Sequence, residues 1–173
     1  MKRIVVSDLH IGSINCREEE LHKFISSIEC DELILAGDVV DFLKIPSFTA
    51  TTVKLLNTLN KFNKVIYIIG NHDHSLANFV NGAVGNIQFL NSYEFVDGER
   101  KFRIEHGDDY DQSFWHNFTE GFLIKVISLF QDWIERRFDV DLATYINSGD
   151  WVSHTTYVSI EQGVTRLKKF VDD

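Results

Sequence analysis

Carboxylate, imidazole and amide side chains gather in four short clusters along this chain. The clusters are Ser7-Asp8-Leu9-His10, Gly37-Asp38-Val39-Val40-Asp41, Gly70-Asn71-His72-Asp73-His74 and His106-Gly107-Asp108-Asp109. Side chains of these types bind divalent metal ions and move protons. The clusters therefore predict metal-assisted or acid–base chemistry.

Each cluster follows a short segment that has the character of a β-strand. Three of these segments are continuous apolar runs rich in β-branched residues, as in strands buried on both faces, and they span Arg3–Ser7, Glu32–Ala36 and Val65–Ile69. The fourth cluster follows Lys101–Glu105. Ligand sites in open α/β sheets lie beyond the carboxyl ends of the strands. We therefore expect the four clusters to converge on one rim of a sheet.

The segments between these strands have helical spacing. Apolar residues recur every three to four positions in Glu18–Ile28 and in Thr51–Phe62. The order strand, helix, strand, helix, strand predicts a parallel sheet with crossover helices. Shorter strands are expected at Ile87–Leu90, Tyr93–Val96 and Lys101–Glu105, with a hairpin turn at Asp97-Gly98. The predicted fold class is α/β, with a mixed, mostly parallel sheet flanked by helices.

The C-terminal third of the sequence reads as helical. Aromatic and aliphatic residues recur at helical spacing across Phe114–Phe138, and a further helix is expected from about His154 to Val171. We therefore predict a core domain over residues 1–110 and a helical cap over 111–173. The aromatic helix has two interpretations: the core of the cap, or a surface for acyl chains, a membrane or a second copy of the chain.

Convergence of the clusters would crowd negative charge. Asp8, Asp38, Asp41, Asp73 and Asp108 would repel one another, and the clusters contain no lysine or arginine. Divalent cations would balance these carboxylates. A donor set that mixes imidazole with carboxylate suits manganese, iron or zinc better than magnesium or calcium.

Composition limits the partners. The formal net charge is −9, which argues against bulk nucleic-acid binding but leaves room for a small phosphorylated substrate. Cys16 and Cys30 fit no paired-cysteine motif, and the absence of a signal-like segment indicates a cytoplasmic protein, with peripheral membrane contact as an open alternative.

The clusters resemble the signature of the calcineurin-like metallophosphoesterases, which reads DxH, GDxxD, GNHD, a histidine motif and then GHxH. The first three motifs match at Asp8–His10, Gly37–Asp41 and Gly70–Asp73, and the resemblance covers about residues 3–110. The His106-Gly107-Asp108 motif is similar to the branch that includes UDP-2,3-diacylglucosamine pyrophosphatases. His72 departs from that branch, where arginine is common.

The resemblance implies a metallophosphoesterase-like sandwich and a role for each matching residue. One metal ion would bind Asp8, His10 and Asp38, and a second would bind Asp38, Asn71 and His106. A hydroxide between the two ions would be the nucleophile. His72 would stabilise the phosphate or protonate the leaving oxygen, with Asp73 orienting it. Mn²⁺ is the expected metal, with Fe²⁺ or Zn²⁺ as alternatives.

The fifth motif of the family, GHxH, is absent from the 173 residues. Either the natural protein continues beyond Asp173 and carries the motif there, which we favour, or it ends there with an impaired centre in which His116 or His154 substitutes. Three functions therefore stay open. They are a two-metal hydrolase of phosphate esters or pyrophosphates, a binding or scaffold module on the same fold, and a nucleotide phosphodiesterase or nuclease.

Overall fold

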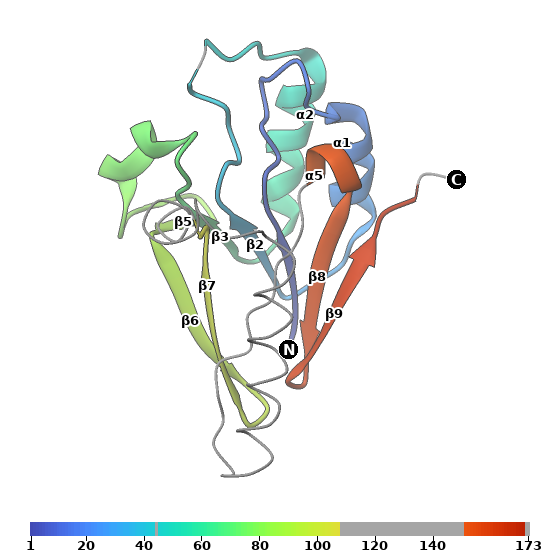
Figure 1. Ribbon diagram of the computed structural model, residues 1–173, viewed down its shortest axis with the longest axis vertical. Coiled ribbons are helices and arrows are strands. Elements are labelled where there is room, and N and C mark those ends of the chain that lie inside the picture. Colours follow the sequence, from blue (N-terminus) through green and yellow to red (C-terminus); the bar gives the residue numbers. More distant parts are fainter. Residues whose placement is uncertain (44, 108–150, 172–173) are drawn as a thin grey trace, which may run out of the picture. The chain divides into compact units, whose positions relative to one another are not determined.

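The computed structural model describes residues 1–43, 45–107 and 151–171 (Figure 1). Its centre is a seven-stranded sheet with the strand order β4-β5-β3-β2-β1-β8-β9. The strands span Lys2–Val6 (β1), Glu32–Ala36 (β2), Val65–Ile68 (β3), Ala83–Val84 (β4), Ile87–Leu90 (β5), Thr156–Glu161 (β8) and Val164–Lys169 (β9).

The sheet is mixed, as predicted. The four strands β1, β2, β3 and β5 pair in parallel. Antiparallel strands close both edges, because β4 pairs with β5 and the β8–β9 hairpin pairs with β1. The three central apolar segments are buried on both faces, which is why they read as continuous rather than alternating hydrophobic runs.

Two helices cover one face of the sheet. They are α1 (Glu18–Ser27) and α2 (Ala50–Thr58), and α2 is extended by the 3₁₀ turn η1 (Leu59–Lys61). Phe24 of α1 and Leu55 of α2 pack in one hydrophobic cluster with Val6 and Leu35 of the strands. Thr49 caps α2 by accepting hydrogen bonds from the backbone N–H groups of residues 51 and 52. Both helices were predicted from their spacing.

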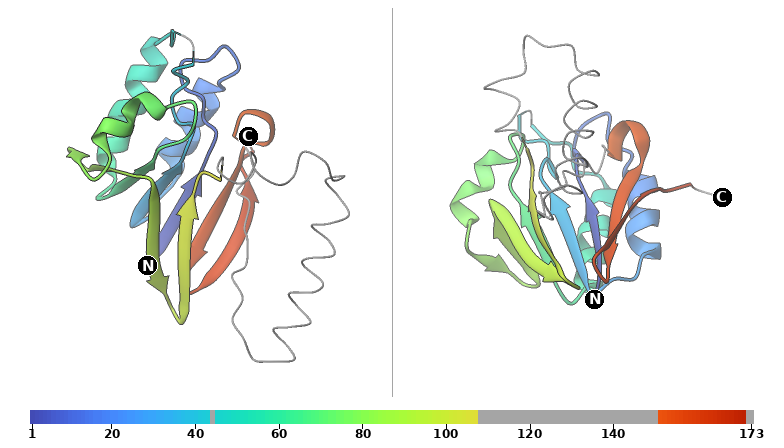
Figure 2. Two further views of the ribbon diagram at one scale, coloured as in Figure 1. Left: turned by 60° about the vertical axis from the view of Figure 1, so that its left-hand side comes forward. Right: turned by 60° about the horizontal axis from the view of Figure 1, so that its bottom comes forward.

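A separate two-stranded sheet covers the opposite face (Figures 1 and 2). It is the hairpin of β6 (Ser92–Asp97) and β7 (Arg100–Glu105), which was also predicted. Phe95 and Phe102 stack across its strands with ring centroids 5.2 Å apart, and both pack against the cluster that contains Ile34 and Ile66. The part of the chain that the structure describes is therefore layered as helices, large sheet and hairpin.

The predicted helix at about His154–Val171 is wrong. Only α5 (Trp151–His154) is helical there, and the chain then forms the β8–β9 hairpin. Gly163 was the available turn signal in the sequence, and in the structure Gln162 and Gly163 both have positive φ, at 52° and 74°, as hairpin turns require. Val158 and Ile160, two positions apart in β8, both face the side of the sheet that the β6–β7 hairpin covers.

This correction changes the predicted domain boundary. Residues 151–171 belong to the same compact unit as Met1–His106, so they are not part of a cap that spans 111–173. The aromatic segment Phe114–Phe138 lies outside the described residues, and the cap prediction for it stays a prediction. Among the described helices, none is long and apolar enough to cross a membrane.

Candidate metal centre

The loops that follow β1 and β2 run side by side at the carboxyl ends of the strands. The Asp8 N–H donates to the Gly37 carbonyl at 3.1 Å, and the His10 N–H donates to the Asp38 carbonyl at 2.9 Å. One residue further along, Ile11 pairs in the same way with the loop of the second motif. The first two clusters therefore meet at one rim, as predicted.

Three rim residues adopt a left-handed backbone. The φ angles are 56° for Asp8, 47° for His10 and 53° for Asp38. Residues other than glycine rarely occupy this region, which costs on the order of 1–3 kcal/mol and persists only where the surroundings enforce it. Such strain concentrates at functional sites, and here it falls on three of the predicted ligands.

Asp38 lies at the centre of the rim and presents its two oxygens to different groups. Oδ1 lies 3.3 Å from His106 Nε2 and accepts a 2.9 Å hydrogen bond from the His72 N–H. Oδ2 lies 3.9 Å from His10 Nε2 and 3.8 Å from His72 Nε2. Ligand atoms of Asp8, His10 and Asp38 all lie within 4.8 Å of one another. A carboxylate with this arrangement can bridge two cations.

His106 and Asn71 form the other side of the rim. His106 Nδ1 lies 3.1 Å from the Ala36 carbonyl, and its Nε2 lies 3.0 Å from Asn71 Oδ1. Because the carbonyl can only accept, it fixes a proton on Nδ1, the tautomer that leaves Nε2 as a metal ligand. Nε2 then faces two oxygens, Asn71 Oδ1 and Asp38 Oδ1, so only a proton or a metal ion satisfies the arrangement.

The electrostatics fit this description. Burial lowers the pKa of His106, but the hydrogen bond and charge of Asp38, the Ala36 carbonyl and the charge of Asp8 outweigh it and raise that pKa to about 9. Burial opposes ionisation of Asp38, yet the hydrogen bonds from His106 and from the His72 backbone lower its pKa. A metal ion would replace the proton of His106, as metal binding to histidine does.

Asp8 behaves differently from Asp38. Burial raises its pKa, and the hydrogen bond from Ser7 and the charge of His106 offset that only in part. The Asp8 carboxylate is therefore short of positive charge. A cation at the rim would supply it.

Two glycines make room for these side chains. A Cβ on Gly37, whose φ is +85°, would clash with the His106 ring. A Cβ on Gly70 would clash with the Asp38 carboxylate and its backbone nitrogen. The glycines of the second and third motifs are therefore required by close approach to the predicted ligands.

Asp41 holds His72, although Asp73 was predicted to do so. Asp41 Oδ1 lies 3.1 Å from His72 Nδ1. The carboxylate of Asp73 is fully buried and accepts from the Val39 N–H, the Gly70 N–H and the Tyr67 hydroxyl, at 2.9, 2.6 and 2.8 Å. The prediction that Asp73 orients His72 is therefore wrong, because its oxygens are used to tie together the second and third loops.

Tyr67 was missed as part of the site. Burial and the neighbouring Asp73 raise the pKa of its hydroxyl, which stays protonated and donates to that carboxylate. A tyrosine within a continuous apolar strand needs a partner for its hydroxyl, and this was the available signal.

The remaining sequence candidates stand apart from the rim. His74 begins η2 (His74–Phe79) and is exposed. Ligand atoms of His10, Asp41 and His72 also lie within 4.8 Å of one another, and His154, in α5, belongs neither to this group nor to that of Asp8, His10 and Asp38. Asp108 and His116 lie outside the described residues.

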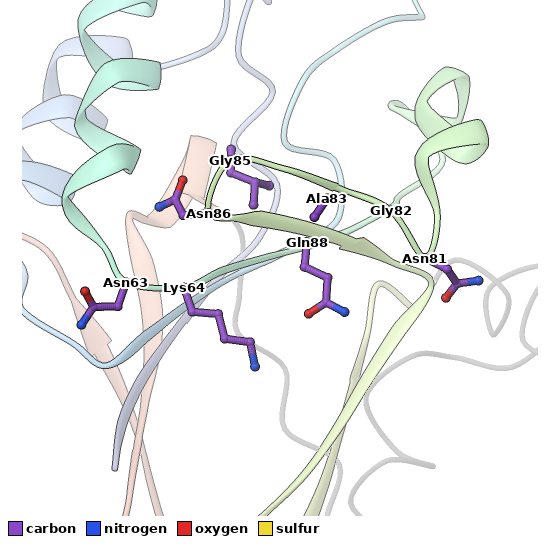
Figure 3. Close-up of a pocket in the computed structure, with 9 residues that line it drawn as sticks. Asn63, Lys64, Asn81, Gly82, Ala83, Gly85, Asn86 and Gln88 are labelled. Atoms are coloured by element: carbon purple, nitrogen blue, oxygen red, sulfur yellow. The ribbon is translucent and has the colours of Figure 1, made fainter.

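An open hollow of about 330 Å³ lies at the β4–β5 edge of the sheet (Figure 3). It contains no member of the rim clusters, and its Lys64 is paired with Glu32 at 2.6 Å. The hollow is therefore not the candidate site. Its lining residues are Asn63, Lys64, Asn81, Gly82, Ala83, Gly85, Asn86, Ile87 and Gln88.

Fold and rim together define an α/β protein with a cluster of carboxylate and imidazole side chains at the sheet edge that could hold a divalent metal ion. The family model for calcineurin-like phosphoesterases matches residues 1–172, and the chain belongs to this family of metal-dependent phosphoesterases. No curated protein matches the chain.

Solved structures similar to the chain include Vacuolar Protein Sorting 29 from Cryptosporidium parvum, at 13% identity and a TM-score of 0.49 over 96% of this chain and 95% of that one. A single mutant of Vps29 from Entamoeba histolytica is 12% identical, with a TM-score of 0.48 over 97% of both chains.

Proposed function

We propose that this chain hydrolyses a phosphate ester or pyrophosphate bond in a small phosphorylated substrate with the help of two divalent metal ions. Mn²⁺ is the first candidate, and Fe²⁺ or Zn²⁺ are the alternatives. The observation that carries the proposal is the position of Asp38, which turns one oxygen to His106 and the other to His10 and His72.

Asp8, His10 and Asp38 would hold one ion, and Asp38, Asn71 and His106 the other. When bound, the two ions would supply a hydroxide nucleophile at neutral pH and neutralise charge on the phosphoryl oxygens. The imidazole of His106 would release its proton on binding, because the same nitrogen lies between two acceptor oxygens.

The other residues of the rim would fix its geometry and manage protons. Asp73 ties the loops of the second and third motifs together through backbone N–H groups, so it acts as a positioning residue. Hydrolysis needs a proton for the leaving oxygen. The resemblance implies that His72 supplies it, and water beside the partly exposed His72 ring is the other source.

The substrate class is narrowed by charge and by the resemblance. A net charge of −9 disfavours a polynucleotide. A nucleoside diphosphate linked to a sugar is one candidate, because the His106 motif resembles that of UDP-2,3-diacylglucosamine pyrophosphatases. A nucleotide phosphodiester is the other. Either substrate is consistent with the cytoplasmic location that we propose.

The test compares three substrates on metal-stripped protein reloaded with Mn²⁺: a nucleotide phosphodiester, a UDP-sugar and an oligonucleotide. We expect turnover of one of the small substrates, dependent on Mn²⁺, and none of the oligonucleotide. Failure of all three with Mn²⁺, Fe²⁺ and Zn²⁺ would contradict the proposal, as would equal turnover without metal.

A binding module is the second candidate function. The loop after β1 and the loop after β2 touch, since the Ser47 N–H donates to the Gly12 carbonyl at 3.0 Å. They expose apolar side chains, with 98% of Ile14, 65% of Leu43 and 96% of Ile45 accessible. This exposed apolar surface favours a partner-binding role. Metal binding without any turnover would support this second function over the first.

A further inference from the structure

We propose that the open edge of β9 (Val164–Lys169) binds an extended, acidic segment of another protein, which adds a strand to the large sheet. This binding uses none of the rim residues and is separate from the proposed hydrolysis. β9 is the last strand in the sheet order, beside β8, and no strand of the described residues pairs with its other edge (Figure 1). An open edge presents backbone N–H and C=O groups that can capture an extended peptide.

The pairing with β8 determines which backbone groups of β9 point outward. The Phe170 N–H, just beyond β9, donates to the Thr155 carbonyl at 2.8 Å, and the same register continues along the whole of β9. Hydrogen-bonded and non-hydrogen-bonded pairs alternate in an antiparallel ladder. The N–H and C=O groups of Thr165, Leu167 and Lys169 therefore point away from β8 and are available to a further strand.

The side chains of β9 are exposed on both faces, unlike those of β8. Leu167 is 59% exposed, whereas Val158, directly opposite it in β8, is 3% exposed. Leu167 lies on the same face of the sheet as Val158, because opposite residues of an antiparallel pair share a face. Arg166 and Lys168 lie on the other face, since successive side chains of a strand alternate. An added strand would therefore meet Leu167 on one face and two basic side chains on the other.

The charge of β9 selects an acidic partner. Arg166, Lys168 and Lys169 belong to a strand without any acidic residue, in a chain whose net charge is −9. Among the described residues none of these three forms an ion pair, whereas Arg3 and Lys64 are both paired. Acidic side chains at alternate positions of an added strand would lie opposite the basic side chains, and opposite charges across two strands stabilise their pairing.

A second copy of this chain fits the edge poorly. If two β9 strands paired about a two-fold axis at Leu167, Arg166 of each copy would lie opposite Lys168 of the other. If the axis lay at Arg166 or at Lys168, that residue would lie opposite its own copy. Lysine on an edge strand is a common means of opposing such self-pairing. The same charges favour a strand in which an apolar residue, matching Leu167, stands between two acidic ones.

The test uses the full chain and two synthetic probes: a short peptide in which glutamate and valine alternate, and a control peptide with lysine in place of glutamate. We expect NMR titration to show binding of the acidic probe only, weakening as the salt concentration rises. Amide hydrogen exchange should slow at Thr165, Leu167 and Lys169, whose N–H groups point outward. It should stay unchanged at Arg166 and Lys168, whose N–H groups point toward β8.

Two charge reversals provide the matched comparison. Lys168→Glu should weaken binding of the acidic probe by about tenfold or more, because it replaces attraction across the strands by repulsion. Lys54→Glu makes the same change of charge at an exposed position of α2, and it should leave binding unchanged.

The proposal is overturned if the acidic probe does not bind, if both probes bind equally, or if the two variants lose binding equally. A second copy would be the occupant if sedimentation showed a dimer whose outward amides of β9 are protected without a probe. Vesicles of phosphatidylcholine and phosphatidylserine that bind the wild type but not Lys168→Glu, without slowing exchange at those amides, would assign the edge to a membrane surface instead. None of these results depends on metal or turnover, so the proposed function is tested separately.

Discussion

Two polar clusters lie at opposite ends of the same parallel strands, and they solve the problem of buried charge in different ways. The rim cluster follows the strand ends and comprises Asp8, His10, Asp38, Asn71 and His106. The basal cluster comprises Arg3, Glu32 and Lys64 at the starts of β1, β2 and β3, together with Tyr93 and Asp97 of the hairpin strand β6.

The basal cluster is balanced by its own residues. Glu32 Oε2 lies 2.6 Å from Arg3 Nε, and Glu32 Oε1 lies 2.6 Å from Lys64 Nζ. On its other side, Arg3 Nη1 lies 2.9 Å from Asp97 Oδ1. Burial opposes the charge on Glu32, but its bonds to Lys64, Arg3 and Tyr93 outweigh burial and lower its pKa. The Arg3 guanidinium also lies 4.1 Å from the centre of the Phe95 ring. Every charge in this cluster has a partner of opposite sign.

The rim cluster is not balanced in this way. In the part of the chain that the structure describes, its carboxylates pair with histidines and N–H groups and with no lysine or arginine. Its backbone is also strained at Asp8, His10 and Asp38, whereas none of the five basal residues has positive φ. The basal cluster balances its own charges, whereas the rim cluster leaves carboxylates that a cation would balance, as the proposed function requires.

The largest expected effect comes from removing the charge at the centre of the rim. Asp38→Asn keeps the shape of the side chain and tolerates the left-handed backbone, but it removes the carboxylate that faces both predicted ions. We expect kcat/KM to fall by about 1,000-fold or more, equivalent to about 4 kcal/mol. Steady-state kinetics with saturating Mn²⁺ measures this. Full activity in the variant would contradict the proposed role of Asp38.

The matching change at the base is Glu32→Gln. It leaves Arg3 with Asp97 alone and removes the buried partner of Lys64. Because breaking a buried ion pair leaves unbalanced charge, we expect a loss of about 3 kcal/mol in the free energy of unfolding. Urea denaturation followed by circular dichroism measures this. Metal binding should not change, and a variant that lost metal sites would show that the two clusters are coupled.

Two glycine substitutions distinguish the cost of backbone strain from the cost of a steric clash at the rim. Gly37→Ala introduces a Cβ that meets the His106 ring, whereas Gly85→Ala places one in open space at a similarly positive φ. We expect a cost of about 1 kcal/mol at Gly85 and about 3 kcal/mol at Gly37, since overpacking adds to the strain. Equal costs in urea denaturation would mean that the His106 contact is unimportant.

The smallest expected effect is the pH dependence of the basal cluster. The pKa of Glu32 is lower in the folded protein than its ordinary value of 4.5, so the folded state favours the carboxylate. The stabilisation is therefore complete above about pH 4.5 and is lost as the pH falls through the lower, folded value.

Urea denaturation of the wild type and Glu32→Gln between pH 7 and pH 3 tests this dependence. The difference in unfolding free energy between the two proteins should be constant at neutral pH and shrink below about pH 4.5. A difference that grew on acidification would contradict the prediction that folding lowers the pKa of Glu32.

The rim was largely predictable from the sequence, because its residues follow strands whose apolar patterns are strong. Asp8, His10 and Asp38 lie within reach of one ion, and Asn71 and His106 lie together beside them. Parallel strands bring their carboxyl ends to one edge, so a local signal was enough.

The contacts within the rim were less predictable. Neither Asp41 nor Asp73 carries a sequence feature that says which of them touches His72, because the answer depends on how two loops pack. The C-terminal hairpin was missed for another reason. Thr156–Glu161 forms β8, between β1 and β9, yet the helical spacing before it was extended through the Gln162-Gly163 turn.

The most direct test of the central claim is a calorimetric Mn²⁺ titration of the metal-stripped chain, with Glu32→Gln and Asp38→Asn in parallel. The account predicts two bound ions in the wild type and in Glu32→Gln, with weakened binding at both sites in Asp38→Asn. A wild-type protein that bound no Mn²⁺, or an Asp38→Asn variant that bound two ions as tightly as the wild type, would contradict it.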